Sequence, residues 1–303
     1  MKELYESAKQ IILNNYNGDL DEETLDILTV SVMALFARFS DVSQKRIPEI
    51  LGKLEIHFGD KSISEMVSDR YPEYPIGEIG EHTNAFVTRA MKLGDDNKFD
   101  EEWTMFVSKS AIKHDSVNIV AKTTHELVHL LRFNGIIDSD TEAKIRDGFS
   151  VGRVNKETKV LKRKHYNFEE GVVEYFTIQS MENLYELIKN DDVSFSPILS
   201  TFKSNFETNF KKSYEIERFF LDGLLRDKKF EELLEYSFVD QSEPLTLVTH
   251  FNNVVGDSSG FTRLSRTIDR VVDCATAEDT SNFKKNTDDA IKQINGFLAK
   301  TKR

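Results

Sequence analysis

The sequence predicts an α+β fold in which grouped strands are flanked by helical regions. Apolar residues recur at helical spacing in residues 1–50, and the pattern returns from residue 190 to 303. Between residues 51 and 115 this pattern gives way to short alternating segments, as strands would show. Strands that are grouped, with helices before and after them, are typical of α+β chains.

Composition and charge limit the class of protein further. With 39% hydrophobic residues, the 303-residue chain can bury a sizeable core in one large or two ordinary domains. Its 40 basic and 52 acidic residues give a net charge of −12, so we expect neither nucleic acid nor membrane as a partner. We find no secretory signal pattern and no run near 18 apolar residues, and therefore expect a cytoplasmic protein. Because Cys274 is the only cysteine, metal ligands must be histidines and carboxylates.

The predicted elements follow in order along the chain. The segment 22–39 repeats apolar residues at helical spacing, which predicts a helix within residues 1–50. Three strands are predicted next, at residues 54–58, 84–89 and 103–107. The segment 71–77 contains two prolines and is predicted to be an extended loop.

The second half of the chain is predicted to be mostly helical. A helix should run from Asp115 or Ser116 to Phe133, with Asn134-Gly135 as its stop. A hairpin follows, with strands at 149–154 and 159–163, and then a helix at 168–189. These patterns suggest three regions: an N-terminal helical region (1–50), a catalytic domain (51–190) and a C-terminal helical domain (191–303).

The most informative segment is His125-Glu126-Leu127-Val128-His129, which predicts a metal site. Two histidines four residues apart on a helix lie on one face and can bind the same ion. Glu126 can then project toward a water bound to that ion, while Leu127 and Val128 face a core. A histidine six residues after His129 would define one common zinc class, but Gly135 occupies that position, so the third ligand must come from another element.

The segment Glu169-Glu170-Gly171-Val172-Val173-Glu174 supplies that third ligand. Glu170 and Glu174 lie one helical turn apart, so Glu170 can bind the ion while Glu174 orients a ligating histidine. Choosing Glu169 instead would place the apolar Val173 at the supporting position. Gly171, next to the proposed ligand, would permit the helices of the two motifs to approach closely.

With these two motifs, the chain resembles the gluzincin superfamily of zinc metallopeptidases. The resemblance covers roughly residues 51–190 and implies a zincin-like fold, in which a small mixed sheet packs on the helix that carries His125 and His129. It also implies Zn²⁺ as the cofactor and hydrolysis of a peptide or protein substrate. Asn84 and Ala85 are similar to the edge strand on which some gluzincins bind substrate backbone.

The expected mechanism depends on the charge of the ion. Zinc lowers the pKa of a bound water to near 7, and Glu126 takes the proton and later delivers it to the leaving amine. In related gluzincins a Tyr or His beyond the glutamate ligand stabilises the oxyanion. Tyr236 is our first candidate for that role, ahead of His250, Tyr166 and His165.

Two other functions remain open at this stage. The chain can be a catalytically restrained or inactive gluzincin-like module that keeps a metal and acts as a regulatory or interaction protein. It can also be a host-directed toxin protease, although it carries no recognisable delivery module. Retention of Glu126 favours the peptidase, because a purely structural zinc site does not need this carboxylate. The sequence leaves the oligomeric state and the substrate preference open.

Overall fold

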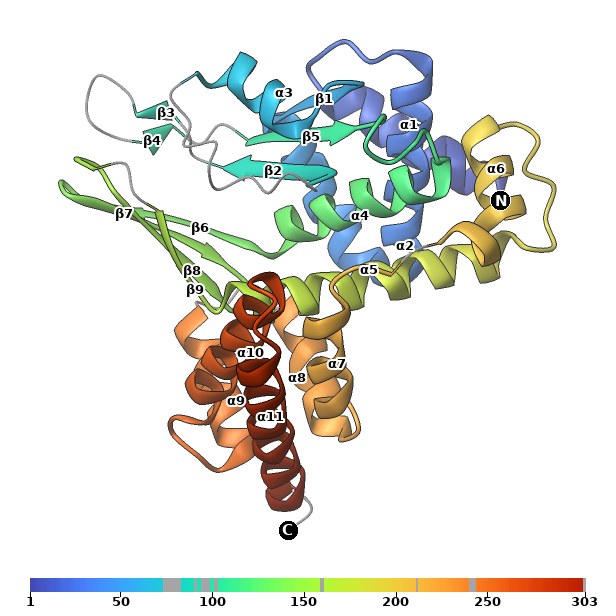
Figure 1. Ribbon diagram of the computed structural model, residues 1–303. Coiled ribbons are helices and arrows are strands. Elements are labelled where there is room, and N and C mark those ends of the chain that lie inside the picture. Colours follow the sequence, from blue (N-terminus) through green and yellow to red (C-terminus); the bar gives the residue numbers. More distant parts are fainter. Residues whose placement is uncertain are drawn as a thin grey trace. The chain divides into compact units, whose positions relative to one another are not determined.

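A computed structural model describes residues 1–72, 83–89, 92–93, 99–100, 103–158, 161–210, 212–239 and 244–301. The fold is mixed α+β, with helices predominating over small sheets, which confirms the predicted class (Figure 1).

The chain divides into two compact units, each built from two segments: Met1–Leu131 with Phe176–Lys211, and Arg132–Tyr175 with Lys212–Arg303. The predicted division into three consecutive regions remains a prediction. No helix within the described ranges combines the length and apolarity that crossing a membrane requires.

The first unit begins with the helices α1 (Lys2–Asn15) and α2 (Glu22–Lys53), which agree with the helical pattern predicted for residues 1–50. A buried carboxylate, Asp26, joins them to α6 (Pro197–Asn209). It accepts hydrogen bonds from the Tyr5 hydroxyl at 2.8 Å, the Ser196 hydroxyl at 2.7 Å and the Ile198 amide at 3.1 Å. Burial of Tyr5 and its contact with Asp26 raise the pKa of the phenol. Asp26 is thus a satisfied structural group.

The sheet of the first unit contains the three predicted strands, in the order β1-β5-β2 (Figure 1). β1 (Leu54–Gly59) runs parallel to β5 (Trp103–Ser108), and β2 (Ala85–Arg89) is antiparallel to β5. The short helix α3 (Ile63–Arg70) was not predicted, although Ser62 and Glu65 form a capping box at its start. β3 (Lys92–Leu93) and β4 (Phe99–Asp100) make a two-stranded pair. Most of the predicted 71–77 loop lies outside the described residues.

The helix with the histidine motif is α4 (Ser116–Arg132), and its last residue differs by one from the predicted end at Phe133. Asp115 caps it, accepting a hydrogen bond from the Val117 amide at 3.0 Å. The predicted stop at Asn134-Gly135 is wrong, because α4 continues at once into a strand. Gly135 has φ +102° and lies at a register shift within that strand. Its left-handed conformation therefore serves a β-bulge rather than a helix cap.

The second unit contains a four-stranded antiparallel sheet in the order β6-β7-β8-β9 (Figure 1). Its strands are β6 (Phe133–Asp138), β7 (Glu142–Asp147), β8 (Ser150–Asn155) and β9 (Leu161–Lys164). The pairing of β8 with β9 confirms the predicted hairpin. β6 was missed because its Asn134-Gly135 pair was interpreted as a helix stop. β7 was missed because charged residues surround its two apolar positions.

The remaining helices confirm the helical prediction after the hairpin. α5 (Tyr166–Ile188) begins two residues earlier than expected and runs from the second unit into the first. The second unit adds five helices among its described residues: α7 (Glu215–Leu224), α8 (Lys228–Val239), α9 (Pro244–Val255), α10 (Gly260–Thr276) and α11 (Thr280–Thr301). α10 packs against α7, α9 and α11.

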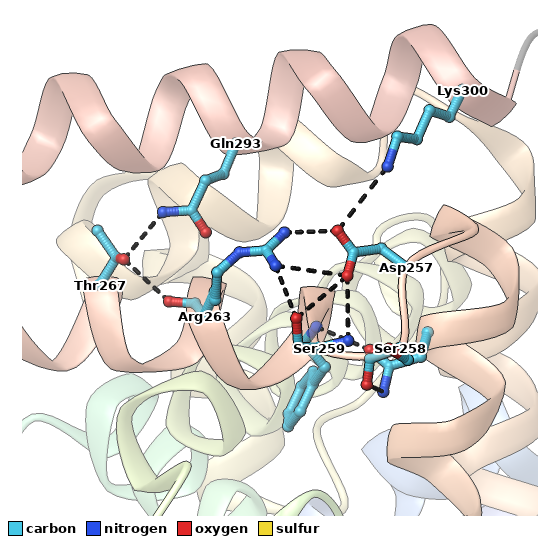
Figure 2. A network of polar contacts seen from close by, with 9 residues as sticks. Asp257, Ser258, Ser259, Arg263, Thr267, Gln293 and Lys300 are labelled. Atoms are coloured by element: carbon cyan, nitrogen blue, oxygen red, sulfur yellow. Dashed lines mark hydrogen bonds and ion pairs between the residues drawn. The ribbon is translucent and has the colours of Figure 1, made fainter.

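The loop between α9 and α10 is held by the carboxylate of Asp257 (Figure 2). Asp257 accepts a hydrogen bond from the Ser259 amide at 3.0 Å and pairs with Arg263 at 2.5 Å. The Lys300 ammonium on α11 lies 3.8 Å from the same carboxylate. The bond from Arg263 holds the pKa of Asp257 well below its usual range. One side chain thus links the loop, the first turn of α10 and α11.

Candidate metal centre

The two motif histidines lie on α4, a helix whose apolar residues are packed in a core. Leu127, Val128 and Leu130 are fully buried, so they anchor the helix in its core. His125 and His129 are also buried, and their ring centroids lie 5.0 Å apart at an interplanar angle of 71°. α4 thus combines apolar residues packed in a core with two neighbouring histidines, which is the arrangement that the motif predicts.

The structure brings the third predicted ligand to these histidines. One potential ligand atom from each of His125, His129 and Glu170 lies within 4.8 Å of the other two, and all three residues are buried. Within the described ranges, it is the one group of His, Cys, Asp and Glu side chains with this geometry. This group consists of the same three residues that the sequence motifs suggest as ligands, and it could hold a metal ion.

Two imidazoles and one carboxylate are a donor set found in catalytic zinc sites. Ligands at zinc distances of about 2.0–2.2 Å in a tetrahedral arrangement lie about 3.4 Å apart. Separations of up to 4.8 Å would close to that value through small side-chain movements. The residues present thus fit a zinc ion.

The neighbouring Glu169 has a different role, since it forms a buried ion pair with Arg132 at the end of α4. Glu169 and Arg132 are 1% and 2% exposed. Arg132 donates from Nε to Oε1 and from Nη2 to Oε2, the latter at 3.0 Å. The Phe149 amide donates to the same carboxylate at 2.8 Å, and Arg132 Nη1 donates to the Ser237 hydroxyl at 3.1 Å. Burial raises the pKa of Glu169, and the Arg132 guanidinium opposes that rise.

A glycine makes this ion pair possible. Gly148 has φ +51°, a conformation that side-chain-bearing residues seldom adopt. A Cβ atom at this position would collide with both carboxylate oxygens of Glu169 and with Arg132 Nη2. Arg132 and Glu169 therefore fill the space beside the Gly148 backbone. Sequence reasoning missed this pair, because its members are 37 residues apart and no local motif joins them.

Two residues that follow Glu170 on α5, Gly171 and Glu174, have contacts within the second unit. Glu174 is buried and accepts a hydrogen bond from the Ser213 amide at 2.5 Å. Gly171 lies against α7, where an added Cβ would lie 3.2 Å from Glu217 Cβ. The predicted close approach at Gly171 between the helices of the two motifs remains a prediction. The predicted support of a histidine by Glu174 remains a prediction.

Glu217 on α7 is an acidic residue that sequence reasoning missed. It is 9% exposed, and burial raises the pKa of its carboxyl, with smaller contributions from the charges of Glu170 and Glu174. A signal for it exists in the sequence. Glu217 occupies the same helical stripe as the buried Phe220, Leu221 and Leu224, where an acidic residue is unexpected.

The predicted substrate residues lie at an edge of the first sheet. β2 pairs only with β5 among the described strands, with Ala85 opposite Val107. The Asn84 carbonyl accepts a hydrogen bond from the Ser108 amide at 3.0 Å. An edge strand of this kind can accept an extended peptide, but the substrate role of Asn84 and Ala85 remains a prediction.

The predicted oxyanion residues occupy several environments. Tyr236 is 40% exposed, and its ring stacks on His250 with centroids 5.1 Å apart. The Tyr166 ring lies 4.7 Å from the Arg163 guanidinium. None of these contacts assigns a catalytic function, so the choice of Tyr236 also remains a prediction.

His165, immediately before α5, is a structural residue with a strongly shifted pKa. It has φ +62°, and its Nδ1 lies 2.8 Å from the Ser265 hydroxyl. Burial lowers the pKa of its imidazole from 6.5 to about 4, and the charges of Lys164 and Arg266 add to the effect. His165 is therefore held neutral at pH 7.

This shift predicts a loss of stability in mild acid. Below pH 6.5 the unfolded chain protonates His165 while the folded chain does not, so the free energy of unfolding should fall by up to about 3 kcal/mol as the pH drops from 6.5 toward 4. Urea unfolding across this range measures the effect. The control is His165→Asn, since asparagine tolerates positive φ without titrating. An equal pH slope in both proteins would remove His165 as the cause.

No protein-family model, curated protein or solved structure matches the chain. The resemblance to gluzincins therefore depends on the two motifs in the sequence.

Proposed function

We propose that the protein is a zinc-dependent metallopeptidase of gluzincin type. One observation carries the proposal: His125, His129 and Glu170 offer ligand atoms within 4.8 Å of one another, from two helices whose motifs lie about 40 residues apart in the chain. Two imidazoles and one carboxylate are three ligands, and a tetrahedral zinc ion with three protein ligands has a fourth position for water. The presence of Glu126 in the same motif adds the base that hydrolysis requires.

The residues divide the proposed reaction among them. His125, His129 and Glu170 would hold the ion, which when bound supplies Lewis acidity toward water and a scissile carbonyl. Glu126 accepts the proton of the attacking water and donates it to the leaving amine. Its side chain is 7% exposed, and a proton acceptor shielded from bulk water suits this step. Tyr236 is proposed as the oxyanion donor and Glu174 as the support of a ligating histidine.

Metal content tests the proposal first. We expect about one zinc per chain by elemental analysis of the purified protein, because three protein ligands suffice for a catalytic site. His129→Ala should reduce the content well below one. The matched control is His57→Ala, since His57 lies outside the cluster and pairs instead with Glu55 at 2.9 Å. A wild-type protein without zinc that also fails to take up the metal on titration would contradict the proposal.

Burial of the site favours a second candidate function. His125, Glu126, His129 and Glu170 are between 2% and 7% exposed. Such shielding also suits a catalytically restrained module that keeps its metal for stability or regulation. A protein that contains zinc and loses stability on chelation, yet cleaves no member of a peptide library, would favour this alternative.

A further inference from the structure

The β6–β9 sheet carries a row of positive charges on one face. Lys162 lies opposite Arg153 in the register of β9 with β8, and Arg153 lies opposite Lys144 in the register of β8 with β7. Residues that are directly paired across strands project to the same side of a sheet. Lys144, Arg153 and Lys162 therefore form one line across three strands, which we call the cationic row. Lys164, two residues along β9, projects to the same face.

This face is the exposed one. On the opposite face Ala143 and Ser150 are buried, whereas Arg153, Lys162 and Lys164 are exposed. Within the described part of the chain, these three cations make no ion pair, and Lys144 lies 3.3 Å from Glu142. Like charges directly opposite each other, such as Arg153 and Lys162, destabilise a sheet. A chain of net charge −12 thus keeps unneutralised cations where they cost stability.

Protection of a sheet edge explains only part of this pattern. Lysines on an edge strand discourage unwanted pairing, and Lys162 and Lys164 lie on the outer strand β9. Lys144 and Arg153, however, lie on the inner strands β7 and β8, where no edge needs protection. A surface that attracts negative charge accounts for all four residues.

The position of β9 at the end of its sheet indicates what kind of ligand fits. Among the described strands β9 pairs only with β8, and a strand with one strand neighbour is the kind of element beside which an extended peptide can add. Such a peptide offers backbone groups for strand pairing, and its side chains at alternate positions would lie on the cationic face. A nucleic acid offers no backbone amides and usually engages more phosphates than four cations can neutralise. These features favour a polypeptide.

The sheet is joined directly to both helices that carry the proposed ligands. α4 ends at Arg132 and β6 begins at Phe133, while His165 alone separates β9 from α5. We infer that the cationic row and the edge of β9 bind an extended acidic segment of a polypeptide. As a preference for acidic substrates, this inference rests on the proposed peptidase function. As a binding surface, it can be tested without catalysis.

The test uses two fluorescein-labelled decapeptides, one alternating Glu with Thr and the other Gln with Thr. Fluorescence anisotropy is measured with the full chain carrying Glu126→Gln, so that neither peptide is cleaved. We expect the glutamate peptide to bind at least about tenfold more tightly, and high salt to remove the difference. Arg153→Gln with Lys162→Gln should lose the preference without lowering Tm, because it removes a like-charge pair. The control is Lys284→Gln with Lys285→Gln, two exposed lysines on α11.

Each result decides the inference. Equal binding of both peptides, or an unchanged preference in the Arg153/Lys162 variant, would overturn it. A single-stranded DNA decamer that bound more tightly and displaced the peptide would overturn the polypeptide assignment. Acid-selective binding without any cleavage by the wild-type protein would refute the peptidase function and leave the surface intact. Cleavage by the wild-type protein without acid preference would refute the surface alone.

Discussion

Glu126→Gln is expected to lower kcat for peptide hydrolysis by about 10²- to 10⁴-fold while zinc content stays near one per chain. Glutamine keeps the size of the side chain but cannot accept the proton of the attacking water. The metal ligands His125, His129 and Glu170 are unchanged, so the ion should remain bound. Initial rates with a fluorogenic peptide library, together with elemental analysis, measure both quantities.

An exposed glutamate provides the matched control for this experiment. Glu231→Gln on α8 makes the same chemical change outside the motif and should leave both rate and zinc content unaltered. If Glu126→Gln cleaved peptides as fast as the wild type, Glu126 would not be the base. A variant that lost zinc as well as activity would show that Glu126 supports the site and not the proton transfer alone.

Arg132→Met is expected to reduce the free energy of unfolding by about 3–5 kcal/mol, because it leaves the buried Glu169 carboxylate without its counter-ion. Both side chains are almost fully buried, so water cannot replace the lost hydrogen bonds. Urea unfolding followed by circular dichroism measures the loss.

A double variant separates the charge from the packing. Arg132→Met with Glu169→Gln removes both charges and keeps an acceptor for the Phe149 amide. Since a neutral buried pair has no uncompensated charge, the double variant should recover more than half of the loss. A double variant as unstable as Arg132→Met would assign the loss to packing around Gly148 and not to charge.

The sequence predicted those elements whose pattern is long or strongly periodic. α2, α4 and α5 have apolar repeats over several turns, and β1 and β5 are bounded by clear turn signals. β6 and β7 were not predicted, because each has only six residues and is stabilised by pairing with neighbouring strands. β7 also has charged residues at four of its six positions. From Gly135 we correctly predicted a residue with positive φ, but we assigned it to a helix cap. A β-bulge can also require a positive φ, so the glycine alone does not distinguish the two structures.

The candidate site was predictable where the information is local. Helical spacing alone predicts that His125 and His129 lie on one face of a helix, and that Glu174 lies one turn from Glu170. Contacts made by distant segments were not predictable in this way. Arg132 meets Glu169, and Gly171 faces Glu217, through tertiary packing that no local spacing encodes.

The interleaved construction of the two units has a consequence for synthesis on the ribosome. The segment Arg132–Tyr175 is translated before Phe176–Lys211, yet it belongs to the unit that Lys212–Arg303 completes. The first unit can therefore finish assembling before the helices α7 to α11 of the second unit have been synthesised. A nascent chain halted near residue 211 would expose the β6–β9 strands without those helices, a state in which chaperones become important.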